Sequence, residues 1–153
     1  INDRTYYPIY AKCCELGVPV TMQVGVHSMR SGARNVGRPI YLDDIAFDFP
    51  ELKLIGLHLG WPWLDEMVML AKAHENVFII ADAPPPRFWG KPLVDYIAQR
   101  DWANKDGSKK VMWGTDWPVQ TVAASLADLE TLGFSEEVMA DLTYNNAKRI
   151  LNL

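Results

Sequence analysis

The chain has 153 residues, of which 49% are hydrophobic and 22% charged, so it fits one globular domain and none of the disordered classes. Its formal net charge of −4 leaves no excess of lysine and arginine to neutralise nucleic-acid phosphates or an anionic membrane surface. Its longest apolar runs are strand-sized, far short of the ~20 residues of a membrane helix. These features argue against a nucleic-acid partner and against a membrane span.

The chain begins Ile1-Asn2-Asp3-Arg4, without an initiator methionine or a signal-peptide pattern, which predicts an internal cut in a longer chain. Cys13 and Cys14 are adjacent in an expected helix, where they point in different directions and cannot easily bridge each other. We therefore expect reduced thiols with packing roles and a cytoplasmic protein.

The first half of the chain alternates predicted helices with short apolar runs that are predicted to be buried strands. In order, the segments are a helix over residues 8–16, a strand over 18–24, a helix over 41–47 and a strand over 52–57. Pro8 suits the first turn of its helix, Gly17 is placed to end that helix, and Pro50 closes the next one.

The second half continues the alternation. Its segments are a helix opened by Gly60 and Pro62, a strand over 77–81, a helix over 92–102, a solvent loop over 104–109 and a strand over 110–113. The first of these helices is the clearest, because Trp63, Met67, Leu70 and Ala71 share one face. Ser135 is a good N-cap for a helical tail, whose apolar periodicity continues over residues 140–151.

The near-continuous apolar character of the predicted strands is typical of a parallel sheet covered on both faces. Their spacing of roughly 25 to 35 residues matches a βαβ repeat. An α/β fold with parallel strands is therefore predicted, in one of two architectures. One is an open doubly wound sheet, and the other is part of a (β/α)8 barrel, whose full length is typically ~250 residues.

Polar side chains follow every predicted strand. Gln23 and His27 end the first strand segment, His58 follows the second, Asp82 the third and Asp116 the fourth. In both architectures function sits at the carboxyl ends of the parallel strands. The sequence therefore places a candidate site at that rim.

Three motifs, in this order and at these spacings, resemble the amidohydrolase-related family. They are FPELKLIGLHLG at residues 49–60, VMWGTDWP at 111–118 and NNAKRIL at 145–151. That family contains metal-dependent hydrolases and the decarboxylases related to aminocarboxymuconate-semialdehyde decarboxylase. The resemblance spans residues 7–153 and implies the C-terminal half, four βα units, of a (β/α)8 TIM barrel. Residues 1–153 would then form a single partial domain without its N-terminal half.

The resemblance also implies a divalent metal, with zinc the favoured ion. Asp116 matches an eighth-strand Asp that binds the metal and can take a proton from bound water. His58 matches a sixth-strand His, which is a general acid or base in decarboxylase-like members and a metal ligand in binuclear hydrolases. The family's first-strand ligand pair is absent from these residues, and Gln23, a poor ligand, stands where the fifth strand carries a His. We expect the isolated chain to bind metal poorly and to be inactive.

Structural roles compete with these assignments. His58 could be a hydrogen-bonded structural histidine, and Asp116 could be a helix N-cap before Pro118. The flanking glycines and the family match favour chemistry at His58, and the Gly-Thr-Asp-Trp-Pro context favours it at Asp116. Asp82 precedes Ala83 and a run of prolines, which favours a turn-starting Asx role.

Residues that bind substrate are sought near the same strand ends. Trp61 and Trp117 lie where aromatic walls commonly line pockets. The predicted substrate-binding set is Gln23, His27, Trp61 and Trp117. If the loop after the first strand is a lid rather than a solvated surface, its guanidinium groups would suit a carboxylate-bearing substrate. These are Arg30, Arg34 and Arg38.

The sequence thus predicts a metal-dependent hydrolase acting on a small organic, carboxylated substrate. A non-oxidative decarboxylase would use the same ligand set, and a catalytically inactive half-barrel scaffold or binding module stays open. So does a complete doubly wound sheet that binds a small ligand, although no Gly-rich phosphate loop follows any strand. A half barrel has unpaired edges, so we expect the N-terminal half of the barrel or a homo-oligomeric partner to cover them.

Overall fold

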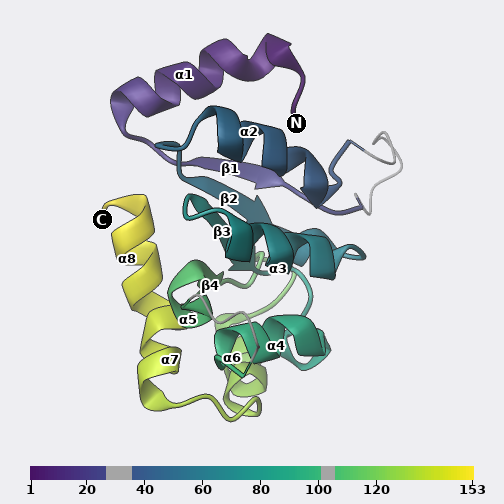
Figure 1. Cartoon of the computed structure of the whole chain (residues 1–153). Coiled ribbons are helices and arrows are strands. Elements are labelled where there is room, and N and C mark those ends of the chain that lie inside the picture. Colours follow the sequence, from purple (N-terminus) through teal and green to yellow (C-terminus); the bar gives the residue numbers. More distant parts are fainter. Residues whose placement is uncertain (27–35, 101–105) are drawn as a thin grey trace.

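The computed structural model describes residues 1–26, 36–100 and 106–153. Its centre is a parallel four-stranded sheet in the order β1-β2-β3-β4 (Figure 1). The strands are β1 (Val20–Gln23), β2 (Leu54–Leu57), β3 (Val77–Ala81) and β4 (Val111–Trp113). All four predicted strands and their parallel pairing are confirmed.

Helical segments separate the strands. The α-helices are α1 (Tyr7–Leu16), α2 (Leu42–Asp48), α3 (Leu64–Ala73), α4 (Lys91–Ile97), α5 (Gly107–Lys110), α6 (Val122–Glu130), α7 (Glu136–Ala140) and α8 (Asn146–Leu151). Short 3₁₀ turns are η1 (Arg4–Tyr6), η2 (Pro39–Tyr41), η3 (His58–Gly60) and η4 (Pro86–Phe88), and a π-helical turn, η5 (Asp141–Asn145), joins α7 to α8. Within the described residues, no helix is long and apolar enough to cross a membrane.

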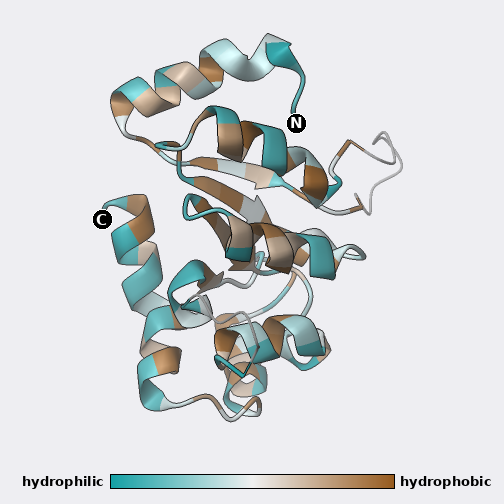
Figure 2. Cartoon of the chain, viewed as in Figure 1, coloured by the Kyte–Doolittle hydropathy of each residue, from teal (hydrophilic) through white to brown (hydrophobic). Residues whose placement is uncertain are grey.

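The main core lies between one face of the sheet and the helices. Met22, Leu54, Ile79 and Val111 of the strands pack there with buried residues of α2, α3, α4 and α6. Figure 2 shows the hydrophobic residues gathered on the strands and on parts of each helix. A smaller cluster on the opposite face joins alternate strand residues to α8, and its members are Ile55, Phe78, Met112 and Ile150.

The strand order decides between the two predicted architectures. The order runs from β1 to β4 without reversal, and most helices pack on a single face of the sheet. A doubly wound sheet reverses its strand order at a switch point, whereas the strands of a barrel wall follow one another in sequence order, as they do here, although α8 covers part of the opposite face. The sheet is therefore a segment of barrel wall, and the doubly wound alternative is wrong.

The inner face of this wall is open toward the carboxyl ends of the strands. Thr21 and Gln23 on β1 are exposed, and Leu57 and Ile80 are only half-buried. Register pairs Thr21 with Ile55 and Gln23 with Leu57, so all four side chains lie on the same face. In a closed barrel this face would be covered by the side chains of the remaining strands.

Two local predictions need correction. The helix expected to reach residue 102 ends at Ile97, because Gln99 takes a left-handed conformation with φ of 56°. The loop expected over residues 104–109 contains the start of α5. A Cβ atom at Gly107 would lie 2.0 Å from the Tyr96 carbonyl oxygen, so close packing rather than solvent exposure explains this glycine. Residues 101–105 lie outside the described parts of the chain.

Other local features follow the sequence more closely. Ser135 caps α7, as predicted, because its hydroxyl accepts the Val138 N–H at 3.3 Å. The residues after it are helical to Leu151, with the π-helical turn inserted. Cys13 and Cys14 are both free.

The amino ends of the strands are fastened by polar side chains that bind backbone carbonyls. Asn76 donates to the carbonyls of Ala46, Phe49 and Leu52 at 3.0–3.2 Å, which closes the end of α2. The buried amide of Asn146 donates to the carbonyls of Ser108 and Val111 at 2.5 and 2.7 Å. Buried carbonyls need such donors, so we infer that the polar side chains at this end of the sheet stabilise the fold.

Candidate active site

The site begins with His58, the residue that directly follows β2. Its backbone is left-handed, with φ of 60°, a conformation that is unusual for a residue with a side chain. Its backbone N–H donates to Oδ1 of Asp82 at 2.7 Å. Its ring Nδ1 lies 3.0 Å from the same oxygen. The residue that follows β2 therefore places its imidazole against the carboxylate of Asp82, the residue that follows β3.

Asp82 directly follows β3 and is only 8% exposed. The expected Asx turn is wrong, because the carboxylate accepts from His58 instead. An Asx turn needs the N–H of the residue two positions on, and that residue is Pro84, which has none. Pro84 is therefore the signal in the sequence that argues against an Asx turn and leaves the Asp82 carboxylate available for the site.

Asp116 lies three residues beyond β4 and is half-buried, with φ of 50°. Its carbonyl accepts the Val119 N–H at 2.8 Å, which makes it the first residue of a turn. The N-cap alternative is excluded, because α6 begins at Val122 and is capped by Thr121. The left-handed backbone therefore turns Asp116 toward the rim without a capping role.

The three side chains form one cluster at the carboxyl ends of β2, β3 and β4. His58, Asp82 and Asp116 each offer a ligand atom, and these atoms all lie within 4.8 Å of one another. Left-handed residues occur in all three loops, at His58, Ala83 and Asp116, with φ between 50° and 60°. Strained backbone of this kind persists where the surroundings hold it and gathers at functional sites.

The residues present fit a divalent metal. One imidazole and two carboxylates are the donor types that zinc and similar ions bind. In the described part of the chain, the buried Nδ1 of His58 has no well-directed hydrogen-bond partner, although Asp82 Oδ1 is close. A buried polar nitrogen in this state is left to be satisfied by a ligand, or by Asp82 after a small adjustment.

The two carboxylates favour the protonated form of His58. The close approach of Asp82 is the largest effect and raises the imidazole pKa above its usual 6.5. Burial of the ring opposes this shift, and the negative charges of Asp82 and Asp116 add to it. The arrangement can therefore hold a proton on an imidazole at the rim, as general acid–base chemistry requires.

The predicted substrate-binding residues are placed unevenly. Gln23 ends β1, is exposed, and pairs in register with Leu57, which precedes His58. Trp61 and Trp117 are 63% and 76% exposed on the loops that carry His58 and Asp116. His27 lies outside the described residues, as do Arg30 and Arg34.

Of the three arginines in the predicted lid, Arg38 alone lies within the described residues, where it pairs with Glu66. Its guanidinium donates to Glu66 and lies 5.7 Å from the centre of the Trp63 ring. Trp63 itself is half-buried at the N-cap of α3 rather than in the core. The base of the loop after β1 is closed by glycines, since Gly25 N–H donates to the Gly37 carbonyl at 2.7 Å.

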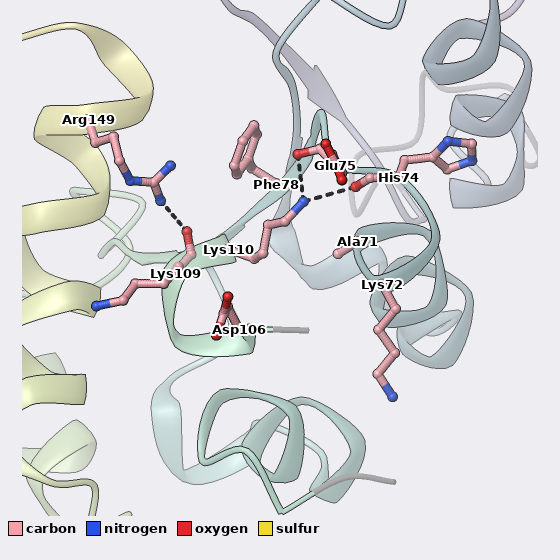
Figure 3. Close-up of a pocket in the computed structure, with 9 residues that line it drawn as sticks. All are labelled: Ala71, Lys72, His74, Glu75, Phe78, Asp106, Lys109, Lys110 and Arg149. Atoms are coloured by element: carbon pink, nitrogen blue, oxygen red, sulfur yellow. Dashed lines mark hydrogen bonds between the residues drawn. The ribbon is translucent and has the colours of Figure 1, made fainter. Parts of the chain in front are cut away.

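A hollow of about 520 Å³ at the opposite end of the sheet is not part of this site. Figure 3 shows its lining, in which Lys110 points to the carbonyls of His74 and Glu75 and Arg149 points to the carbonyl of Lys109. Lys110 also donates to the Val77 carbonyl at 3.2 Å and lies over the Phe78 ring. Because Lys110 and Arg149 already bind protein carbonyls, we interpret the hollow as part of the packing that stabilises the amino ends of the strands.

Comparison with known proteins places this rim in context. The family model described as Amidohydrolase matches residues 1–153. The chain belongs to this family. Amidohydrolases are metal-dependent enzymes, so the metal suggested by the His–Asp cluster agrees with the family. The resemblance seen in the three sequence motifs is confirmed. A comparison with curated proteins finds no match.

Solved structures show the same half of a barrel. An uncharacterised TIM-barrel protein from Bordetella bronchiseptica is 28% identical, with a TM-score of 0.81 over 99% of this chain and 51% of that one. A dihydroxybenzoic acid decarboxylase from Polaromonas, with bound manganese and the inhibitor 2-nitroresorcinol, is 16% identical, with a TM-score of 0.72 over 99% of this chain and 55% of that one. Dihydroorotase from Campylobacter jejuni is 18% identical, with a TM-score of 0.66 over 100% and 53%.

These structures fix the architecture. The chain spans about half the length of the TIM-barrel proteins that it matches. Its four βα units are therefore those of a half barrel, and the rim that carries His58, Asp82 and Asp116 is the end where TIM-barrel enzymes have their active sites. Decarboxylases and hydrolases both occur among its structural neighbours.

Proposed function

We propose that the chain supplies the C-terminal half of a complete barrel, and that this barrel is a metal-dependent hydrolase of a small, carboxylated organic substrate. The observation that carries the proposal is the convergence of His58, Asp82 and Asp116 at one rim, with ligand atoms within 4.8 Å of one another. An imidazole beside carboxylates offers both proton transfer and metal binding in the same few ångströms.

Asp116 is the proposed metal ligand from this half. A carboxylate can bind a divalent ion through one oxygen and leave the other for a proton. When bound, the ion would supply Lewis-acid activation of water or of a substrate oxygen. Zinc is the proposed ion because it accepts mixed nitrogen and oxygen ligands. The remaining ligands would come from the N-terminal half.

His58 is the proposed general acid–base residue. Its raised pKa keeps a proton available at the rim, and Asp82 lies on the Nδ1 side of the ring. Nε2 is then the nitrogen that exchanges a proton with substrate or water. A role for His58 as a second metal ligand is the alternative, and it predicts loss of metal on mutation of His58.

Gln23, Trp61 and Trp117 are proposed to contact the substrate, with His27 added from the predicted loop. Gln23 lies on the open inner face beside the His58 loop. The two indoles are exposed on this half, and a barrel completed by its other strands would bury part of their surface. Substitution of Trp61 by Ala is expected to raise KM more than it lowers kcat.

The metal role is tested by metal analysis of the full-length protein and of its Asp116→Asn variant. We expect about one divalent ion bound near each His58–Asp82–Asp116 cluster in the wild type and a large loss of metal in the variant, because a neutral amide is a weaker ligand. Asp44→Asn, at an exposed position that binds Asn2, is the matched control and should keep its metal. Unchanged metal occupancy in Asp116→Asn would remove the ligand role.

Non-oxidative decarboxylation is the second candidate, and the structural similarity to a dihydroxybenzoic acid decarboxylase favours it. In that reaction His58 would deliver its proton to the carbon from which the carboxylate departs. Carboxylated aromatics and cyclic amides, offered to the full-length enzyme, distinguish the two reactions. Release of CO₂ without uptake of water would replace the hydrolase proposal, whereas products that contain solvent oxygen would support it.

We further propose that the N-terminal half of the barrel covers the open inner face and the free edges of β1 and β4. The exposed side chains of Thr21 and Gln23 and the half-buried Leu57 and Ile80 support this. Residues 1–153 expressed alone should form dimers or larger species, because unpaired strand edges seek a partner. A compact, stable monomer on a sizing column would contradict the proposal.

A further inference from the structure

We infer that Asp82 is the residue that positions His58, so that one buried carboxylate sets both the backbone and the ring of the acid–base residue. This inference rests on the proposed role of His58 as that acid–base residue. Asp82 would act through His58 and would not itself touch the substrate or bind the metal.

The first support is that a single oxygen makes both contacts. Oδ1 of Asp82 accepts the His58 backbone N–H at 2.7 Å and lies 3.0 Å from His58 Nδ1. The backbone contact holds His58 in its left-handed conformation, with φ of 60°. The ring contact favours a proton on Nδ1, which leaves Nε2 free to accept or deliver one.

The second support is the fit of Asp82 between neighbouring strands. A Cβ atom at Gly114, just after β4, would lie 3.1 Å from Cβ of Asp82 and 3.4 Å from Cγ2 of Ile80. Because position 114 has no side chain, Asp82 can pack against β4 while its carboxylate reaches the loop after β2. The side chain is only 11% exposed, so it has little freedom to swing away.

A ligand role for Asp82 is the competing assignment, since its carboxylate belongs to the same cluster as Asp116. The two roles make different demands. A ligand must be negatively charged, whereas a positioning residue needs only an oxygen that accepts hydrogen bonds. In Asp82→Asn the amide oxygen would stay toward His58, because the amide nitrogen cannot accept the His58 backbone N–H.

The test compares Asp82→Asn with Asp82→Ala in the full-length protein, with metal content, kcat and KM as readouts. We expect both variants to keep their metal. Asp82→Ala should lower kcat by about 10²-fold with little change in KM, the scale of a misplaced catalytic group. Asp82→Asn should recover most of that loss. In a His58→Ala background, Asp82→Ala should cost little further activity. Loss of metal from Asp82→Asn, or a kcat of Asp82→Ala equal to the wild type, would overturn the inference.

A second readout does not depend on activity. In ¹⁵N-histidine-labelled, chelated protein, the His58 ring signals are assigned by their loss in His58→Gln. Above the pKa of His58, we expect the Nδ1-protonated tautomer in the wild type and in Asp82→Asn, and a mixture of tautomers in Asp82→Ala. A wild-type ring protonated on Nε2, or one unaffected by Asp82→Ala, would overturn the inference. An inactive, metal-free protein with the expected tautomers would instead count against the proposed function alone.

Discussion

Replacement of Gly60 by Ala should damage the loop that presents His58. Gly60 has φ of 72°, and a left-handed conformation costs a residue with a side chain about 1–2 kcal/mol. An added Cβ would also lie 2.7 Å from Cγ of Pro39 and 3.0 Å from Cβ of Met67. Both neighbours are buried, so neither can move freely, and overpacking of this kind costs typically about 1–3 kcal/mol. The sum is a loss of about 2–5 kcal/mol.

Gly17→Ala is the matched control for this substitution. Gly17 has φ of 64° at the end of α1, but nothing lies within 4 Å of an added Cβ. It should therefore show the conformational cost without the steric one. In thermal unfolding of the full-length protein, each kcal/mol of lost stability lowers the melting temperature by roughly 2–4 °C. Gly60→Ala should therefore melt several degrees below Gly17→Ala. It should also have the lower kcat, because its loop carries His58. Equal melting temperatures in the two variants would refute the steric argument.

The remaining predictions concern the fastened amino end and the metal. Burial of Asp141 is the largest single effect and opposes its ionisation, but the hydrogen bonds from Lys109, Asn145 and Ser108, together with the positive charge of Lys109, outweigh burial and lower the Asp141 pKa below 3.8. The stabilisation by ionised Asp141 should be complete above pH 3.8 and should be lost as the pH falls through the folded-state pKa. The difference in free energy of unfolding between the wild type and Asp141→Asn should therefore shrink in acid. A difference in free energy of unfolding that grows in acid would contradict the predicted lowering of the Asp141 pKa. Asn146→Ala leaves two carbonyls without their buried donor and should lower the free energy of unfolding by about 1–3 kcal/mol in urea titrations; a change near zero would show that water replaces the amide. Chelation should lower both activity and melting temperature, and zinc should restore them, because an ion that binds only the folded state stabilises it; unchanged melting would argue against a bound metal.

Much of the fold could be predicted from the sequence because buried elements have a recognisable pattern of apolar residues. The strands of a covered parallel sheet are short apolar runs, and those at 77–81 and 110–113 were located to within one residue of β3 and β4. Helix ends are harder to predict than strands. The end of α4 depends on the left-handed turn at Gln99, and α5 depends on the packing of Gly107 against Tyr96, and neither leaves a local pattern in the sequence.

The candidate site could be predicted in part. His58 and Asp116 are both placed at one rim, since parallel strands put their carboxyl ends together. The prolines after Asp82 favour a turn at that position, but its actual partner, His58, is 24 residues away in the loop after the neighbouring strand. Contacts between strand-end loops depend on register and backbone conformation, which a single sequence does not specify.

The most direct test is anomalous diffraction from crystals of the full-length protein grown with zinc and measured at the zinc absorption edge. We predict a peak about 2.0–2.2 Å from a carboxylate oxygen of Asp116, on the side that faces His58, with further ligands from the N-terminal half of the barrel. A peak bound elsewhere, or a well-ordered barrel with Asp116 turned away from the ion, would contradict the assignment of this rim as the active site.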